Sequence, residues 1–410
     1  MWELTICRFP LFFFVRRIRY ICIMKRIIIV IMILTSVLSL FSQNLAQPLS
    51  LRSEWTPTWT AEDDENGVVV DIAQYTPLVL PWAMKAIGQP TRSGWGRMAT
   101  SQAFSVVAMA GCVEGLKRVV GENRPDATNN RSFPSGHTAW TFLGATMIER
   151  ELGWRSPWYT FGGYTFASAV AMQRVVDCRH FPIDVAGGAV IGVLTGHLGY
   201  FIGDKIFGDK QLENKYTLLS VGDENQSFLS LETGMSFNLS SLSNGNCKIS
   251  REPSLNVGVK YGMPFGDHWG ASAGAVMRST PIFFESETCG RTFVAPENAV
   301  GVELSPYYRT QLSRRFSLTA EAACGYYRNF SLKSIDRAIE VNDDFVIGRI
   351  GVGSTYRLND DMSVGATLGY EISNAEYKLT PNATYGITQP INIDKTTHSL
   401  TLNISTKVLF

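Results

Sequence analysis

From Phe228 onward, apolar and polar side chains alternate along the chain, and this period of two constrains the fold more than any other feature. Eight runs carry the alternation: Phe228–Leu239, Leu255–Tyr261, Trp269–Met277, Val300–Tyr308, Phe316–Tyr326, Val346–Tyr356, Met362–Ile372 and Leu400–Phe410. Successive side chains of a β-strand point to opposite faces, so each run predicts a strand with one apolar face and one polar face. Residues 226–410 are therefore expected to form an eight-stranded antiparallel β-domain.

The segments between these runs alternate in length. Short, turn-rich links are Gly262–His268, Leu312–Arg315 and Leu358–Asp361, and long polar segments are Ser241–Glu252, Pro281–Asn298, Ser331–Asp344 and Asn374–Thr397. An even strand count with short turns on one side and long loops on the other is typical of a transmembrane β-barrel. The alternative is a soluble β-sandwich, which explains the alternation but not the asymmetry of the connections.

Two further features of residues 226–410 concern the predicted barrel: its C-terminal residues and the charged side chains expected inside it. The final residues Val408-Leu409-Phe410 resemble the terminal signal of bacterial outer-membrane proteins. The lumen of an eight-stranded barrel is filled by side chains, so no pore is expected. The side chains expected to face inward include Glu232, Glu303, Glu321, Glu371, Arg349 and Lys407. Unpaired buried charges are costly, so these groups are expected to pair inside the lumen, and no chemistry is assigned to the barrel.

Three short stretches before the β-domain carry a concentrated set of reactive groups. They are Lys117–Pro125 (KRVVGENRP), Pro134–His137 (PSGH) and Arg174–Asp184 (RVVDCRHFPID). In this order they supply cations, two histidines and a carboxylate, which are the groups needed to hold a phosphoryl group and pass it through a histidine.

Helix periodicity predicts how the first two stretches lie. A helix is expected from Ala99 to Val119, and a helix carried through Lys117 and Arg124 would put both cations on one face. Arg124-Pro125 is expected to end it, because a residue before proline avoids the helical region. A second helix is expected from Thr138 to Leu152, with Ser135 and Gly136 at its start. Free backbone amides at a helix start bind phosphate, and glycine allows close approach of the anion.

The third stretch combines a histidine with a carboxylate one helical turn later. His180 and Asp184 are four residues apart, and Pro182 suits the first turn of a helix. The carboxylate can accept a hydrogen bond from one ring nitrogen and so direct the other nitrogen toward a phosphorus atom. Arg174 adds a planar, permanently charged group that can bind phosphate oxygens.

Together these motifs resemble the type 2 phosphatidic acid phosphatase superfamily, which also contains bacterial acid phosphatases and vanadium haloperoxidases. The resemblance covers roughly residues 67–204, and all three motifs keep the family spacing. It implies an all-α helical bundle, so the whole chain is expected to be a multidomain α and β protein. One departure is Gln173, where the family usually has serine before the arginine. Glutamine can still donate to phosphate or brace Arg174, so a change in substrate fit is expected and not a loss of chemistry.

The resemblance also implies a role for each motif residue. His180 is the nucleophile that forms a phosphohistidine, Asp184 orients it, and His137 is the general acid. The phosphate oxygens are held by Lys117, Arg124, Ser135, Gly136 and Arg174. No metal and no other cofactor is expected, because cations replace the magnesium clamp of other phosphotransferases. Two histidines without further Cys, His and Asp partners also argue against a zinc site.

The first 66 residues have the pattern of a leader. Met24-Lys25-Arg26 precedes the apolar run Ile27–Leu40 and then polar residues, which predicts a signal peptide cleaved near Ser42 to Gln47. Met24 is expected to be the initiator, with the preceding residues an over-extended start, and an uncleaved anchor helix is the alternative. The domains expected are 1–47 start and signal peptide, 48–66 leader, 67–204 phosphatase bundle, 205–225 linker and 226–410 barrel.

These features favour a metal-independent phosphatase of phosphomonoesters or pyrophosphates, with a phosphorylated lipid or a small phosphoester as substrate. The chain is expected in the outer membrane through its barrel, with the phosphatase domain in the periplasm. The helices of the bundle are expected to be compact, with spanning helices as the alternative. A net charge of +1 does not indicate nucleic-acid binding. Other functions left open are a broad-specificity acid phosphatase, a vanadate haloperoxidase, and a structural barrel with an inactive helical domain.

Overall fold

The structure is a computed structural model that describes residues 56–57, 72–208, 226–240, 242–244, 247–287, 290–331, 339–382, 387 and 389–410. Residues 55–410 form one compact unit. The predicted signal peptide with Met24, most of the 48–66 leader and residues 209–225 of the predicted linker lie outside the described residues.

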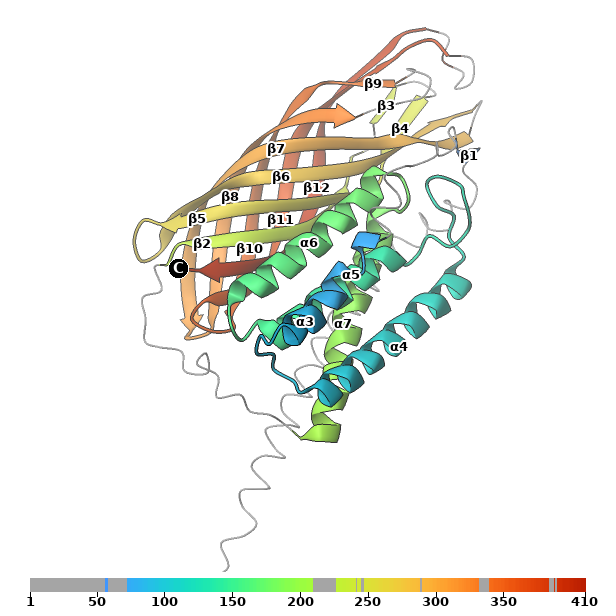
Figure 1. The fold of residues 1–410 in the computed structure, drawn as a ribbon. Helices are drawn as coiled ribbons and strands as arrows, with labels where there is room; N and C mark the ends of the chain where they lie inside the picture. The colour runs from blue at the N-terminus through green and yellow to red at the C-terminus, as the bar shows by residue number, and fades with distance from the viewer. Residues whose placement is uncertain are drawn as a thin grey trace, which may run out of the picture. The chain divides into compact units, whose positions relative to one another are not determined.

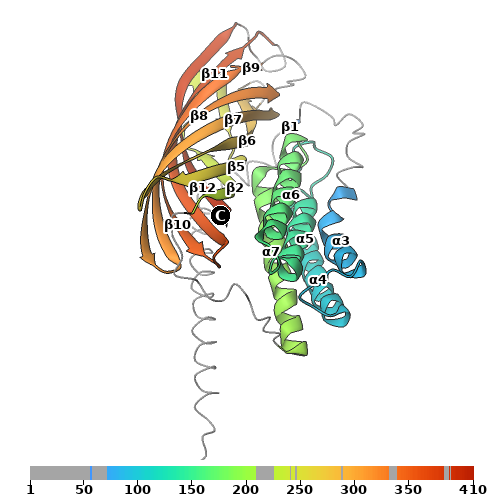
Figure 2. The same ribbon diagram turned by 60° about the vertical axis from the view of Figure 1, so that its left-hand side comes forward.

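Five helices follow the short strand β1 (Thr56–Pro57) in the described part of the chain (Figure 1). They are α3 (Thr76–Ala86), α4 (Trp95–Val120), α5 (Gly136–Leu152), α6 (Pro157–Val176) and α7 (Pro182–Phe207). Figure 2 shows α4, α5, α6 and α7 lying alongside one another as a bundle. The expected all-α bundle is therefore confirmed.

Small residues on α7 allow its backbone to lie unusually close to α5 and α4. A Cβ atom at Gly192 would come within 2.5 Å of the Ala139 carbonyl oxygen, and one at Gly199 within 2.4 Å of the Ser101 carbonyl oxygen. Neither contact is possible for a larger residue without moving a backbone. The glycines of α7 thus hold the start of that helix, which carries Asp184, against the start of α5.

Helix α4 ends within one residue of the expected Val119, but Arg124-Pro125 is not what ends it. The helix stops at Val120, and Gly121 caps it in the left-handed conformation with φ of 60°. A glycine pays no Cβ penalty there, so it ends the helix before Pro125 can. Arg124 therefore lies in the following loop, and the prediction that it shares a helix face with Lys117 is wrong.

Strands β2 to β12 form the C-terminal domain, with bounds β2 (Phe228–Asn238), β3 (Leu242–Asn244), β4 (Cys247–Arg251), β5 (Ser254–Pro264), β6 (Trp269–Ser286), β7 (Gly290–Ser313), β8 (Phe316–Ser331), β9 (Ile339–Val341), β10 (Asp344–Arg357), β11 (Met362–Leu379) and β12 (Ile391–Leu409). Eight of them pair in the order β7-β8-β10-β11-β12-β2-β5-β6, and β6 pairs back with β7. This pairing closes an antiparallel ring, so the predicted eight-stranded barrel is confirmed.

Several segments expected to be long loops are strand instead. β6 and β7 continue through most of Pro281–Asn298 and pair as far as Ser286 and Gly290. Apolar side chains on these extensions form a core of their own with the ends of β11 and β12. Burial of that core favours continued strand pairing over loops. A short strand in the leader, β1 (Thr56–Pro57), pairs in parallel with Thr292 and Phe293 of β7.

Charged side chains fill the barrel interior as ion pairs. Lys260 lies 2.8 Å from Glu232 and 2.8 Å from Glu303, and Arg349 lies 2.7 Å from Glu303. Arg278 binds both carboxylate oxygens of Glu371. The expected pairing of the inward charges is confirmed for these residues. Low-dielectric surroundings make such a network stable only while every partner is present.

Candidate functional site

Three separate segments meet at one end of the helical bundle. A Cβ atom at Gly136 would lie 3.8 Å from the Lys117 Nζ atom, so the end of α4 touches the start of α5. The Ser135 amide donates to the Asp184 carbonyl oxygen at 2.9 Å, which joins the start of α5 to the start of α7. The three motifs, distant in sequence, therefore form one site.

The turn between α6 and α7 presents His180. The amides of Arg179 and His180 both donate to the Arg174 carbonyl oxygen at 3.1 Å, which folds the chain back on the end of α6. The His180 side chain is only 1% exposed and that of Arg174 5%. The turn thus brings the predicted nucleophile and one of the predicted phosphate-binding cations into the same buried space.

Asp184 is fixed beside His180 by two donors. Its Oδ2 atom accepts from the Ser132 hydroxyl at 2.6 Å and from the Phe181 amide at 2.8 Å. The same oxygen lies 3.7 Å from the His180 Nδ1 atom, slightly beyond hydrogen-bond distance. Such contacts tighten when substrate binds, so the geometry fits the orienting role expected for Asp184.

The ring of His180 is in the state that a nucleophile requires. Within the described residues, neither ring nitrogen has a hydrogen-bond partner. Burial lowers the pKa of His180 well below its usual value, and the nearby charges of Arg124, Arg174, Lys117 and His137 lower it further. The imidazole is therefore neutral at neutral pH, as a nucleophile must be. Because these four side chains act on the pKa of His180, all four lie close to its ring, and all four are predicted site residues.

This pKa shift predicts the pH dependence of activity. A lowered pKa means that His180 loses its proton at a lower pH, so the reactive neutral form persists below pH of about 6.5. We expect the acid limb of the kcat/KM profile to fall below that value, with the profile measured on a soluble aryl phosphate. An acid limb centred at or above about 6.5, assigned to His180, would contradict the burial described here.

The residues predicted to bind phosphate lie around the start of α5. Ser135 is fully buried, and its hydroxyl accepts from the Thr138 hydroxyl at 3.0 Å. Gly136 begins α5, so the free amides of its first turn point into the site. Lys117 approaches from α4, and Arg124 from the loop after it. The roles given to these residues in the sequence analysis stay predictions, but their positions are compatible with them.

Two features of the site were not foreseen from the sequence: the role of Ser132 and the partner of Gln173. Ser132 is buried and donates to the carboxylate of Asp184, and its only signal was its place just before the PSGH run. The Gln173 side-chain amide donates to Asp177 at 2.7 and 2.9 Å, one turn along α6. It is therefore engaged with Asp177, and the suggestion that it braces Arg174 has no support among these contacts.

Removal of the Ser132 hydroxyl tests whether the position of Asp184 matters. We expect Ser132→Ala to lower kcat roughly tenfold, since a hydrogen bond to a charged group is worth about 1.5–3 kcal/mol. KM should change little, because the hydroxyl is bound to Asp184 and not to phosphate. A matched control is Ser156→Ala, which removes the hydroxyl that caps the start of α6. A kcat equal to that of the wild type would show that Asp184 needs no such support.

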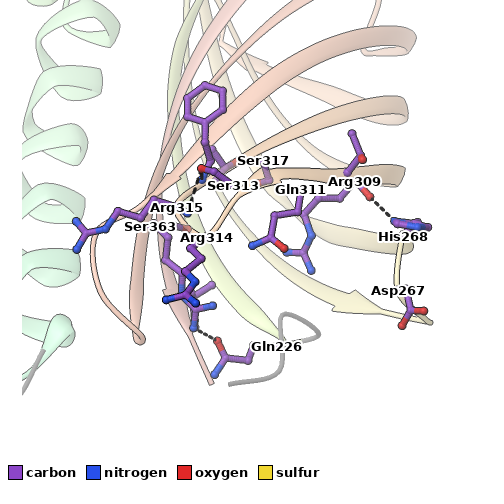
Figure 3. Close-up of a pocket in the computed structure, with 15 residues that line it drawn as sticks. Gln226, Asp267, His268, Arg309, Gln311, Ser313, Arg314, Arg315, Ser317 and Ser363 are labelled. Atoms are coloured by element: carbon purple, nitrogen blue, oxygen red, sulfur yellow. Dashed lines mark hydrogen bonds between the residues drawn. The ribbon is translucent and has the colours of Figure 1, made fainter. Parts of the chain in front are cut away.

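A separate cavity of about 370 Å³ lies at the short-turn end of the barrel (Figure 3). Arg309, Arg314, Arg315 and Arg357 line it together with His268 and polar side chains. All lining residues belong to the barrel or to the residue pair just before it, and none is a motif residue. The predicted catalytic residues thus lie at the bundle end, and not at this cavity. Within the residues that the structure describes, no group of three His, Cys, Asp or Glu side chains has metal-binding geometry.

Comparison with known proteins identifies the family of the helical region. Residues 99–207 match the PAP2 superfamily model. A lipid A 1-phosphatase of Porphyromonas gingivalis is 33% identical over 329 residues, covering 75% of this chain and 72% of that protein. A decaprenylphosphoryl-5-phosphoribose phosphatase of Mycobacterium tuberculosis is 29% identical over 139 residues, covering 32% of this chain and 71% of that protein.

Two solved structures match one domain each. The crystal structure of LpxE from Aquifex aeolicus covers 34% of this chain and 87% of its own, with 22% identity and a TM-score of 0.27. The outer membrane protein OprG from Pseudomonas aeruginosa covers 45% of this chain and 97% of its own, with 13% identity and a TM-score of 0.37. With three motifs joined in one site and a relative aligned over most of both chains, this protein belongs to the PAP2 superfamily and is a phosphatase.

Proposed function

We propose that the protein removes a phosphate group from a membrane lipid through a phosphohistidine intermediate, without a metal ion. One observation carries the proposal: a buried, neutral His180 lies beside a fixed carboxylate and is ringed by cations. That arrangement suits an anionic phosphate ester, because preorganised cations stabilise the charge that develops on the phosphoryl oxygens.

The reaction would proceed in two displacements. The Nε2 atom of His180 attacks phosphorus, and the bond to the ester oxygen breaks as His137 gives that oxygen its proton. His137 then takes a proton from water, whose oxygen attacks phosphorus and breaks the bond to nitrogen. Free phosphate and neutral His180 result. Lys117, Arg124 and Arg174 hold the phosphoryl oxygens throughout, with the start of α5 supplying amides.

The substrate proposed is the phosphate monoester of a lipid A. Support comes from the Porphyromonas gingivalis relative, whose name is lipid A 1-phosphatase and whose alignment extends well beyond the PAP2 region. A barrel in the same chain also favours a membrane-bound substrate over a soluble one. The second candidate is a broad-specificity acid phosphatase acting on soluble esters. The proposed site residues bind the phosphoryl group, which soluble esters and lipid phosphates have in common.

We further propose that the barrel holds the chain in the outer membrane. Closure of the ring, polar lumen pairs and outward apolar side chains such as Val302, Ile350 and Ile404 all suit a lipid-facing wall. For the helical domain the sequence predicts a periplasmic position, but the contacts of α6 with the barrel wall lead to a different proposal.

Substrate choice tests the proposal. The purified, detergent-folded protein should release phosphate faster from a lipid A phosphate than from phosphatidic acid or an aryl phosphate. Chelator should leave the rate unchanged and vanadate should inhibit, since vanadate can bind the same cations. Equal rates on all three esters would favour the broad-specificity alternative, and no release from any of them would favour a structural barrel with an inactive domain.

A further inference from the structure

We propose that the phosphatase site opens on the long-loop side of the barrel, at the headgroup level of the outer leaflet. Its substrate would then be a phosphorylated lipid of that leaflet. The substrate rests on the proposed function, but the position of the site rests only on contacts between the bundle and the barrel.

Contacts along α6 fix its direction relative to the barrel wall. Near the start of α6, Phe161 clusters with Leu231 and Val408, which lie close to the short-turn ends of β2 and β12. Seven residues further along, the Ser168 hydroxyl lies 3.1 Å from the Thr233 hydroxyl. The helix therefore starts at the short-turn end and rises along the outer face of the wall.

The later contacts continue in the same direction. Met172 and Val175 cluster with Leu255, at the end of β5 away from its short turn. After α6, the ring of Phe181 stacks on that of Phe283 at 6.0 Å and meets Phe293 edge-on at 6.1 Å. Both partners belong to the β6–β7 extension, so His180, the neighbour of Phe181, lies at the long-loop end.

Strand geometry gives the height of this contact above the short turns. The aromatic pairs Trp269–Tyr308 and Tyr261–Phe410 mark the short-turn edge of the apolar wall. From Trp269 to Phe283, at roughly 3.3 Å per residue and a tilt of about 40°, the rise is on the order of 35 Å. The apolar band of such barrels is about 25 Å tall, so Phe283 lies in the headgroup region beyond it.

The surface of the bundle agrees with a position at membrane level. Val190, Leu194, Leu198 and Phe201 follow one face of α7 and are between 46% and 57% exposed. By length and hydropathy, α7 could cross a membrane. These exposed apolar side chains belong to the bundle that packs against the apolar outer wall of the barrel, so lipid tails are their natural cover. Short turns of outer-membrane barrels face the periplasm, which leaves the phosphatase site on the outer side.

Charged side chains border the site on this side. Arg118 and Arg131 bind Glu114 at the end of α4, and their side chains are 76% and 48% exposed. Two cations with one acid leave a net positive rim beside the buried cluster. A phosphorylated headgroup in the outer leaflet would meet that rim before it reached His180.

Cysteine labelling on intact cells tests this position without relying on catalysis. The parent chain carries Cys112→Ser and Cys324→Ser, which removes two exposed thiols. Into it we would place Asn130→Cys on the exposed loop of the site, Glu287→Cys beside the β6–β7 hairpin, or Arg314→Cys in a short turn. The probe is a membrane-impermeant maleimide, with labelling measured before and after permeabilisation.

We expect Asn130→Cys and Glu287→Cys both to be labelled in intact cells, to a greater extent than the parent protein. Arg314→Cys should be labelled only after permeabilisation. If Asn130→Cys is instead labelled only after permeabilisation, as Arg314→Cys should be, the site faces the periplasm and the proposal is overturned. Lack of phosphatase activity would leave this result intact, so failure of the proposed function is distinguishable from failure of the position.

A cross-link tests the contact with the barrel itself. The double variant Ser168→Cys with Thr233→Cys replaces hydroxyls that lie 3.1 Å apart. We expect oxidation to cross-link the double variant, and the cross-linked protein to keep the phosphate release of its reduced form. Absence of the cross-link, or its formation with loss of activity that reduction restores, would mean that the active protein does not hold α6 in this place.

Discussion

His180→Gln should lower kcat by at least about 10⁴-fold while leaving the protein folded. The nucleophile forms the intermediate itself, so its loss removes the whole covalent path and not a single supporting contact. Stability should change little, because neither ring nitrogen has a hydrogen-bond partner within the described residues. The measurement is phosphate release at saturating substrate, beside the thermal unfolding of both proteins.

His197→Gln is the matched control for that variant. His197 also lies on the bundle, but its Nε2 atom is 3.9 Å from Glu149 and it is not among the groups that shift the pKa of His180. Its rate should stay within a few-fold of the wild type. If both variants lost activity equally, general damage to the bundle would explain the loss, and the nucleophile would have to be sought elsewhere.

Glu303→Ala should destabilise the barrel by about 3–5 kcal/mol, because removal of one partner leaves buried charges uncompensated. Glu303 is only 2% exposed, and its Oε2 atom lies 2.8 Å from Lys260 and 2.7 Å from Arg349. Tyr327 also donates its hydroxyl to this carboxylate. Urea unfolding of the protein in detergent, followed by loss of its strand signal, measures the change.

Asp267→Ala provides the comparison for a carboxylate outside the lumen network. Asp267 lies in the β5–β6 turn, where a surface change usually costs less than about 0.5 kcal/mol. Equal destabilisation by the two variants would mean that the lumen ion pairs contribute no more to the free energy of unfolding than a surface carboxylate does. The phosphatase rate of folded Glu303→Ala should match that of the wild type, because the barrel supplies no residue to the chemistry.

The barrel was predictable because alternation is a property of the chain itself. All eight runs of alternating residues became strands, and the short links became turns as expected. What failed was the extent of β6 and β7, since Pro281–Asn298 has no clear alternation and only short apolar runs at 282–284 and 293–295. Its strands depend on a core shared with β11 and β12, which no local pattern reveals.

The positions of site residues on helices were predictable from the motif spacing. The positions of residues in loops were less predictable. Lys117, Gly136 and His180 converge because three helices pack closely, and glycines of α7 permit that packing. Arg124 illustrates the limit: a helix was expected to carry it, but Gly121 in the left-handed conformation ended the helix first. Ser132 and the Gln173–Asp177 contact depend on tertiary positions, so the sequence offered only weak signals for them.

Capture of the intermediate tests the central claim most directly. The wild-type protein would be mixed with a radiolabelled lipid phosphate, quenched in alkali within one turnover, and digested for peptide analysis. We expect a labelled phosphoryl group on the peptide that carries His180, formed before phosphate is released and absent from His180→Gln. Phosphate released in a full turnover without any labelled peptide, or a label on another residue, would contradict it.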